Sequence, residues 1–483
     1  MKKIFLIITT VALFFASCER IDYGDINQSP YDPTSDNIDA MMRGAQSSFA
    51  RQGGRNGYSI PSLYVQYQTQ VAYQNEQYYP QNKGDWETNY VNALNTLKSI
   101  YNNTEDVRGS TDNMRAIAEL TSVYIWKRIT DTFGDVPYFE ALQGGANQNP
   151  GYTAQRDIYI DLIARTKAAR DLINNDAFTP GADTDIFYSG DMDKWGKFAN
   201  SFILALTIQL SNTSEAAIAQ AEFQAALANS YGVIESNSDN MVFTPDTSGL
   251  MLNPISTQRG SDYSLSKELT DALRGNGSWG ILPTDTKNPT SNTHIDGRIA
   301  GYLESNLDGA PYGYAVTVSV PGSVGMDDNY DAAGASFTLF SAAYTWLNRA
   351  EGALIYATGE DVNTMFTNGV VASFDNTTDS FGSGATHAAD RIADATGTVT
   401  MAQVIGEEKW IALFPDAYSA WSEQRRTGFP ALHPAPDAIN GGVIPHRMLY
   451  PSGESTLNPS GWAQGKQGLI PADDKNTSKI WWE

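Results

Sequence analysis

The stretch TDNMRAIAELTSVYIWKRITDTFGDVPYFEAL, residues 111–142, decides the fold class. Apolar residues recur along it at helical spacing from Ile117 to Phe133, which predicts an amphipathic helix. Leu120 and Trp126 place apolar groups on the other side as well. Because a helix that is apolar on two faces is buried on both, we predict a long helix wrapped by other helices. The stretch carries no catalytic signal.

Residues at both ends of this stretch are typical of helix boundaries. Asp112 is the expected N-cap, since its carboxylate can accept the free N–H groups of the first turn. Gly134 is the expected C-cap because glycine adopts a positive φ without a Cβ clash. Pro137 then prevents the helix from resuming.

The same periodicity recurs along most of the chain, and it predicts a helical scaffold rather than a sheet enzyme. The lengths and spacing of the segments favour antiparallel helix pairs, although no tetratricopeptide consensus is present. Asp193 and Asp361 are the expected N-caps of two of them. The predicted helices are 38–50, 86–101, 158–172, 194–210, 215–228, 265–274, 336–358, 361–374 and 404–414.

Residues 241–335 differ in character from the rest of the chain. Gly, Pro, Asn, Ser and Thr dominate there, and only the short helix at 265–274 interrupts them. Residues 315–324 alternate in polarity like a strand or one arm of a small hairpin. We predict a loop-rich insertion on a helical frame, where ligand-binding loops are commonly found.

The N-terminal residues are typical of a secretion signal. Lys2 and Lys3 precede an apolar run, residues 4–15, that is too short to cross a bilayer. Cys18, the only cysteine of the chain, follows two small residues and so looks like the lipid-attachment site of a bacterial lipoprotein. We expect residues 1–17 to be a signal peptide and residues 18–36 a tether whose first residue carries lipid. The alternative is an ordinary signal peptide that ends near a chance cysteine.

Charge and composition exclude some classes of partner. The chain has 32 Lys and Arg against 55 Asp and Glu, a formal net charge of −23, which repels the phosphates of nucleic acids. Four histidines argue against a histidine-rich metal centre. Aromatic residues, by contrast, are plentiful, with 25 Tyr, 19 Phe and 10 Trp.

Two groups of aromatic residues lie in polar surroundings rather than in helical stripes. Sugars present C–H faces that can pack on aromatic rings, and their hydroxyls need amide or guanidinium partners. Any single ring is better explained by packing of its loop onto the frame, but the two groups taken together favour ligand contact. The candidate ligand-binding residues are Tyr73, Tyr78, Tyr79 and Trp86 in the first group and Arg259, Trp279, Tyr312 and Tyr314 in the second.

Enzyme activity has weak support in the sequence. Paired carboxylates are the minimum for glycoside hydrolysis, and three pairs are available. Each pair has a structural explanation. The first pair flanks a turn, the second caps a helix, and the third opens a helix, where acidic residues favour the positive end of its dipole. No nucleophile elbow, zinc-protease motif or phosphate-binding loop is present. The pairs are Asp131/Asp135, Asp191/Asp193 and Glu407/Glu408.

A calcium site is a further possibility, because Asp327, Asp328, Asn329 and Asp331 supply hard oxygen ligands within one loop. Their spacing is not that of an EF-hand, so solvated loop acids are the better interpretation. We therefore expect no catalytic residue, no cofactor and no metal.

Several short motifs, taken in order with the N-terminal signal, resemble one family. They are GDVPY at 134–138, GDMDKW at 190–195, KWIALF at 409–414, RRTGFP at 425–430 and IPHR at 444–447. Together they resemble the SusD/RagB nutrient-binding outer-membrane lipoproteins of Bacteroidetes, in their SusD-like branch. The helix around residues 202–206 lacks the arginines that this branch often carries.

The resemblance implies a mostly α fold of tetratricopeptide-like helix pairs, forming a single domain over residues 37–483. It also implies a lipid anchor in the outer membrane, facing the cell exterior, and a SusC-like TonB-dependent transporter as partner. The resemblance does not identify the ligand, because the ligand-binding loops vary within the family. We expect a glycan or oligosaccharide, with a peptide as the second choice. A surface-anchored glycoside hydrolase and an adhesion component are the alternatives from other classes.

Overall fold

The structure, a computed structural model, describes residues 37–52, 55–84, 86–106, 108–246, 251–275, 288–305, 308–314 and 324–483. The predicted signal peptide and tether with Cys18, the aromatic candidate Trp279 and residues 315–323 of the predicted strand lie outside the described residues.

The predicted central helix is present as α5, Asp112–Phe133, and nearly all its side chains are buried. Gly134 ends it with φ of 86°, as expected for a glycine at this position. The predicted N-cap is wrong by one residue, because Thr111 holds that position and Asp112 is the first helical residue. Asp112 instead pairs with Arg115 one turn later, at 3.2 Å.

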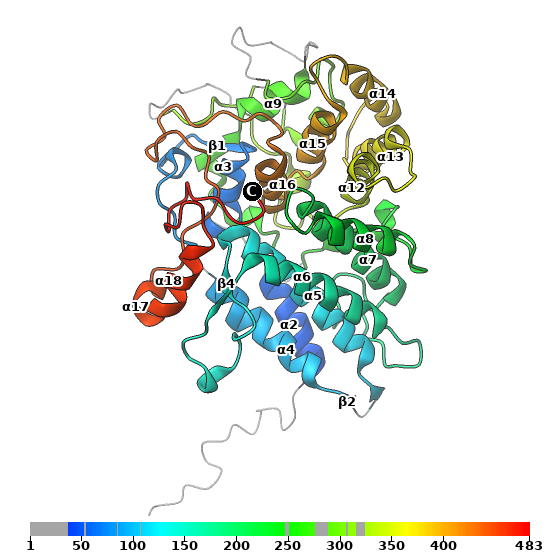
Figure 1. Ribbon diagram of the computed structural model, residues 1–483. Coiled ribbons are helices and arrows are strands. Elements are labelled where there is room, and N and C mark those ends of the chain that lie inside the picture. Colours follow the sequence, from blue (N-terminus) through cyan, green and yellow to red (C-terminus); the bar gives the residue numbers. More distant parts are fainter. Residues whose placement is uncertain are drawn as a thin grey trace, which may run out of the picture. The chain divides into compact units, whose positions relative to one another are not determined.

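The structure is mostly helical, as predicted, and consecutive helices pack side by side. Helix α5 packs against α4, α6 and α7, and α12 packs against α7, α13 and α15 (Figure 1). None of the described helices is long and apolar enough to cross a membrane. The other helices are α2 (Ile38–Ala50), α3 (Ile60–Tyr64), α4 (Asn95–Asn102), α6 (Gln155–Asp171), α7 (Met192–Gln209), α8 (Ala216–Leu227), α9 (Lys267–Arg274), α10 (Ile299–Tyr302), α11 (Asp328–Asp331), α12 (Ala342–Ile355), α13 (Val362–Asp375), α14 (Gly384–Asp394), α15 (Met401–Ala412), α16 (Ala417–Thr427), α17 (Glu454–Leu457) and α18 (Pro459–Gln467).

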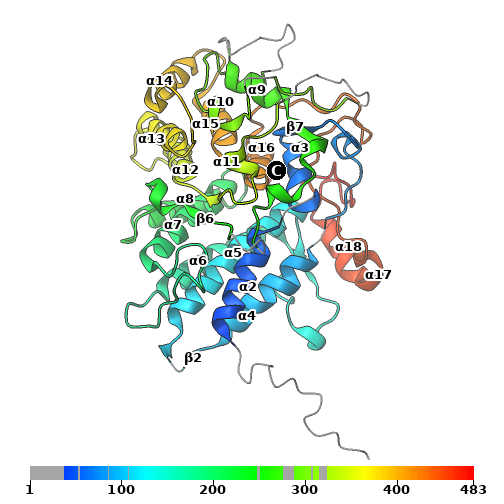
Figure 2. The same ribbon diagram turned by 180° about the vertical axis from the view of Figure 1, so that it is seen from behind.

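The strands are short and form four two-stranded antiparallel sheets among the described residues. The pairs are β1 (Gln68–Gln70) with β7 (Tyr263–Leu265), β2 (Glu105–Asp106) with β3 (Gly109–Ser110), β4 (Val136–Pro137) with β5 (Tyr152–Thr153), and β6 (Met241–Phe243) with β8 (Phe337–Phe340). Two of these pairs, β1–β7 and β6–β8, join segments that are far apart in the sequence. Figure 2 labels one strand of each pair, β7 and β6.

The structure corrects three predictions of local structure. The segment predicted to begin a helix at 336 is strand β8, and helix α12 starts only at Ala342 with Ser341 as its N-cap. Asp191, not Asp193, caps α7 by accepting the N–H of Lys194 at 3.1 Å. Helices α14, α17 and α18 occupy segments that we expected to be irregular. The predicted cap Asp361 is confirmed.

The carboxylate of Asp131 joins four parts of the fold near the C-terminal end of α5. It accepts hydrogen bonds from Lys127 at 2.6 Å, from the Tyr159 hydroxyl of α6 at 2.5 Å and from Ser422 of α16 at 3.1 Å. The indole N–H of Trp482, at the C-terminus, lies 3.3 Å away. A buried carboxylate is stable only when it is hydrogen-bonded and paired, so these elements hold one another in place.

A second buried network joins α12, α15 and α16. Glu351 accepts hydrogen bonds from Arg426 at 2.6 Å and from Lys409 at 2.5 Å, and Glu423 accepts another from Arg426 at 2.5 Å. Burial alone would raise the pKa of Glu423, but Arg426 and Lys409 hold it well below its ordinary value. The carboxylates therefore stay ionised and the network stays paired.

Replacing Asp131 by Ala should destabilise the fold by about 3–5 kcal/mol, because Lys127 and Tyr159 would lose their buried partner. Urea unfolding measures the change. The matched control is Asp171→Ala, whose side chain is exposed and whose loss should cost no more than ~0.5 kcal/mol. Equal effects of the two substitutions would contradict the assigned role of Asp131.

Asp135 should make stability depend on pH. The residue is only 8% exposed, and burial, with a smaller effect of Asp157, raises its pKa from 3.8 to about 6. A carboxyl whose pKa is raised by folding stabilises the fold below the unfolded pKa and loses that contribution as pH rises through 6. Asp135→Asn should therefore unfold like the wild type at pH 4 and be more stable by up to about 3 kcal/mol at pH 8. Thermal unfolding at both pH values checks this, and a pH-independent difference would contradict it.

Candidate ligand-binding surface

The β1–β7 pair brings the two predicted aromatic groups together. Gln70, the last residue of β1, pairs with Tyr263, the first residue of β7. Because the strands are antiparallel, the segment that follows β1 and the segment that precedes β7 share one edge. The N–H of Val71 donates to the carbonyl of Asp262 at 2.9 Å, which fixes this junction.

Tyr73 and Arg259 meet at this edge. The Tyr73 ring is 70% exposed, and the guanidinium carbon of Arg259 lies 5.2 Å from its centroid, a cation–π distance. The Arg259 side chain is also 70% exposed and pairs with Asp262 at 3.4 Å. An exposed ring beside an exposed guanidinium can take both a C–H face and a hydrogen-bond acceptor of a ligand.

Tyr78 continues the same surface. Its hydroxyl lies 3.0 Å from Gln74 Oε1 and 3.0 Å from the carbonyl oxygen of Tyr314, which fixes the half-buried ring. Burial, with a smaller effect of the nearby Asp437, raises the pKa of Tyr78, so the group remains a neutral phenol.

Ile439 also belongs to this surface, and no sequence signal pointed to it. Its N–H donates to the carbonyl of Tyr78 at 2.8 Å, and the residue is 70% exposed. It lies in the irregular tail after Thr427, where nothing marks a ligand-binding residue. We call the set Tyr73, Gln74, Tyr78, Arg259 and Ile439 the tyrosine strip.

Three of the predicted ligand-binding rings are buried away from this surface. Tyr79 and Tyr312 are almost fully buried, with ring centroids 6.4 Å apart. Trp86 is 8% exposed and packs edge-on against Phe133 at 5.1 Å and beside Tyr450 at 5.9 Å. Their burial removes these three rings from the strip, because a ligand could reach them only if the core opened.

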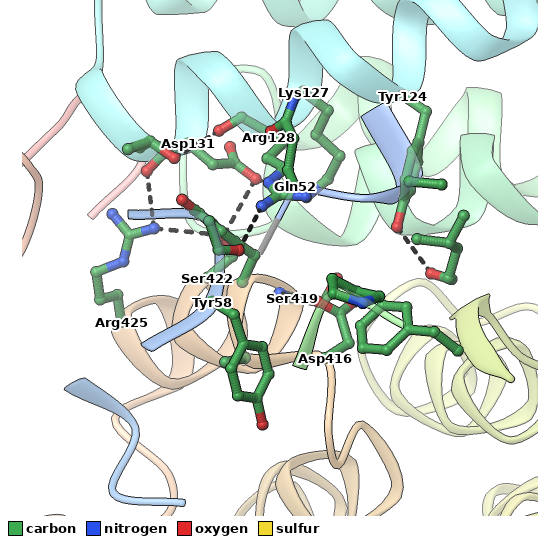
Figure 3. A pocket seen from close by; sticks show the side chains of 18 residues that line it. Gln52, Tyr58, Tyr124, Lys127, Arg128, Asp131, Asp416, Ser419, Ser422 and Arg425 are labelled. Atoms are coloured by element: carbon green, nitrogen blue, oxygen red, sulfur yellow. Dashed lines mark hydrogen bonds and ion pairs between the residues drawn. The ribbon is translucent and has the colours of Figure 1, made fainter. Parts of the chain in front are cut away.

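A separate pocket lies between α5 and α16 (Figure 3). Lys127, Asp131, Ser422 and Arg425 line it, and Arg425 donates to the backbone carbonyl of Asp131 at 2.8 Å. Asp416, the N-cap of α16, lines it beside Ser419. The cavity measures about 40 Å³, which suffices for a few water molecules but not for a sugar ring. We therefore assign it to the internal packing of the frame.

Glu407 and Glu408, one of the carboxylate pairs considered for hydrolysis, form buried ion pairs instead. Glu407 and Glu408 lie in the middle of α15 rather than at its start, which corrects the sequence interpretation. Glu407 accepts from Arg391 at 2.6 Å and Glu408 from Arg298 at 2.6 Å. Burial opposes ionisation of Glu408, yet Arg298 and its other cationic neighbours hold its pKa well below the ordinary value. Glu408 is therefore not poised as a general acid.

One set of potential metal ligands converges within the described residues. Oxygen or nitrogen atoms of Asp296, His387 and Glu408 lie within 4.8 Å of one another. The guanidinium of Arg298 already occupies both carboxylates, at 2.5 Å from Asp296 and 2.6 Å from Glu408. A cation would have to displace this arginine, so the donor set does not fit a metal.

The acidic loop considered for calcium has a different geometry from a chelating loop. Asp327 caps α11 by accepting the N–H of Asn329 at 2.9 Å. No three carboxylates of this loop bring oxygens within 4.8 Å of one another among the residues that the structure describes. The loop acids therefore do not converge on one point.

Comparisons with known proteins agree on one family. The family model described as "SusD-like_2: Starch-binding associating with outer membrane" matches residues 30–451. Comparison with curated protein sequences gives no match.

Solved structures share the fold over nearly the whole chain. A chitin-binding protein is 24% identical, with a TM-score of 0.75 over 92% of this chain and 99% of the other. A chitin-binding SusD homologue from Flavobacterium johnsoniae is 22% identical, with a TM-score of 0.74 over 92% and 98%. A SusD homologue from Parabacteroides distasonis is also 22% identical, with a TM-score of 0.74 over 92% and 97%. At this identity, the likeness establishes the fold.

Trp86→Ala should act on stability because the ring fills space between Phe133 and Tyr450. Truncating a buried tryptophan costs about 3–5 kcal/mol, which chemical unfolding can measure. Tyr73→Ala is the control, since its exposed ring should contribute no more than ~0.5 kcal/mol. A stable Trp86→Ala protein with impaired ligand binding would instead support a ligand contact for Trp86.

Proposed function

The chain belongs to the SusD-like family of starch-binding proteins that associate with the outer membrane, and on that premise we propose that it captures an oligosaccharide at the cell surface without cleaving it. It then delivers the oligosaccharide to a SusC-like TonB-dependent transporter. The tyrosine strip is the capture site.

The observation that carries this proposal is the convergence of Tyr73, Tyr78 and Arg259 on one exposed surface. The three residues come from segments about 180 positions apart, joined by the β1–β7 pair. Exposed tyrosine rings can pack on the C–H faces of sugars, and the guanidinium and the Gln74 amide can hydrogen-bond to hydroxyls. An open strip suits a chain-like ligand, which a 40 Å³ cavity cannot hold.

The relatives support a glycan ligand. The family description names starch, and two similar structures are of chitin-binding proteins. A peptide, the second choice, could use the same rings and amide. Ligand panels that contain both kinds of molecule distinguish them.

The cellular setting is part of the proposal and rests on the N-terminal sequence. Cleavage before Cys18 would leave this residue first, with acyl chains on its sulfur and amine, tethering the domain to the outer membrane on its exterior face. Mass spectrometry of the mature protein tests this, and an N-terminus without acyl chains would contradict it. The transporter as partner rests on the family resemblance, and co-purification with a TonB-dependent transporter tests it.

Tyr73→Ala should weaken oligosaccharide binding by about 1–3 kcal/mol, the usual contribution of an aromatic hot spot. Isothermal titration calorimetry against a glycan and peptide panel measures this, and mass spectrometry of the ligands afterwards reports any cleavage. The matched control is Phe139→Ala, which removes an aromatic ring that is 58% exposed in the loop after β4. Unchanged affinity in the Tyr73 variant would remove the strip as the site, and product release would favour the hydrolase.

A further inference from the structure

Ile439 gives the tyrosine strip an apolar end that is held in place. Its own N–H bonds to the Tyr78 carbonyl, and the neighbouring Ala435 N–H donates to the Tyr79 hydroxyl at 3.2 Å. On its other side, the side-chain amide of Asn440 donates to the carbonyl of Val443 at 2.7 Å. The isoleucine is therefore presented to solvent by a hydrogen-bonded loop.

The opposite end of the strip is polar. The Arg259 guanidinium is exposed, and its ion pair with Asp262 is long at 3.4 Å, which leaves N–H groups for an acceptor on a ligand. Between the two ends, the Gln74 amide bridges to the Gln70 carbonyl at 3.2 Å and to the Tyr78 hydroxyl. The strip thus offers a strong donor at Arg259 and an aliphatic side chain at Ile439, linked by a succession of contacts through Tyr73, Gln74 and Tyr78.

The charges around the strip select against anionic ligands. Arg259 is the one cation of the strip. Asp262 pairs with Arg259, Asp437 lies near Tyr78, and Glu76 shares a short helical turn with Tyr78. The whole chain carries a formal charge of −23. A polyanionic glycan would meet repulsion at close range and in the long-range field.

We propose that the tyrosine strip prefers uncharged glycans that carry acetamido groups; this rests on the proposed glycan-binding function. An acetamido group has a methyl, which needs an apolar contact, and a carbonyl, which needs a donor. Ile439 supplies the first and Arg259 the second. An oligosaccharide repeats the group along its length, so one sugar meets Ile439 while another meets Arg259.

The test compares two ligands that differ only at this group. Chitohexaose and cellohexaose share length and β-1,4 linkage, but chitohexaose has acetamido groups where cellohexaose has hydroxyls. Calorimetry with the wild-type protein should show about tenfold tighter binding of chitohexaose, from one buried methyl group and one added hydrogen bond. A hyaluronan hexasaccharide, which has acetamido and carboxylate groups, should bind more weakly than chitohexaose.

Ile439→Ser should weaken chitohexaose binding more than cellohexaose binding and so abolish most of the preference, because only chitohexaose has an acetamido methyl to lose its apolar contact. Leu457→Ser on α17, which alters a side chain that is 75% exposed elsewhere on the surface, should retain the preference. Three results would overturn this inference while leaving glycan capture intact. They are equal affinities of the wild type for the two hexasaccharides, a preference that survives Ile439→Ser, and binding of the hyaluronan hexasaccharide as tight as that of chitohexaose. Absence of binding to every glycan in the panel would overturn the proposed function itself.

Discussion

The buried carboxylate of Asp131 is the constraint on which the arrangement of the helical frame depends. Its oxygens accept from α5, α6 and α16, and from the indole of Trp482 at the end of the chain. Its backbone carbonyl also accepts from Arg425 at 2.8 Å. A buried carboxylate needs such partners to be stable, so the contact with Trp482 near the end of the chain completes the hydrogen bonding of Asp131.

The frame carries the tyrosine strip through a short series of contacts. The indole N–H of Trp410 on α15 donates to the carbonyl of Val65 at 3.0 Å, and the Tyr67 hydroxyl donates to the carbonyl of Trp410. The Ser266 hydroxyl donates to the carbonyl of Gln66. The segment before β1 is thus tied to the helices and to the segment after β7. Because these anchors are buried, the exposed residues beyond them can contact a ligand without loosening the core.

The sequence predicts elements well where the signal is local. Helix α2 has the predicted bounds. Gly134 ends α5 and Asp361 caps the start of α13, the positions where glycine and aspartate are common. Prediction failed where a distant partner decides the structure. Residues 337–340 read as the start of a helix, yet they pair as β8 with β6, nearly a hundred positions earlier.

The same distinction explains the site. The Tyr/Gln-rich stretch contains part of the proposed surface, but its letters cannot distinguish the exposed Tyr73 from Trp86, which Phe133 and Tyr450 bury. Ile439 joins the strip only because the tail folds back onto Tyr78. Polar surroundings in the sequence therefore suggest a candidate region, while long-range contacts determine which of its side chains are exposed.

The tyrosine strip, and not the interior of the helical frame, is the proposed ligand-binding site. Hydrogen–deuterium exchange with and without a saturating oligosaccharide distinguishes the two locations. Binding on the strip should slow exchange of amides in residues 70–79, 259–265 and 436–440 and leave the helices around Asp131 unchanged. Protection confined to the pocket between α5 and α16, or protection nowhere, would contradict it.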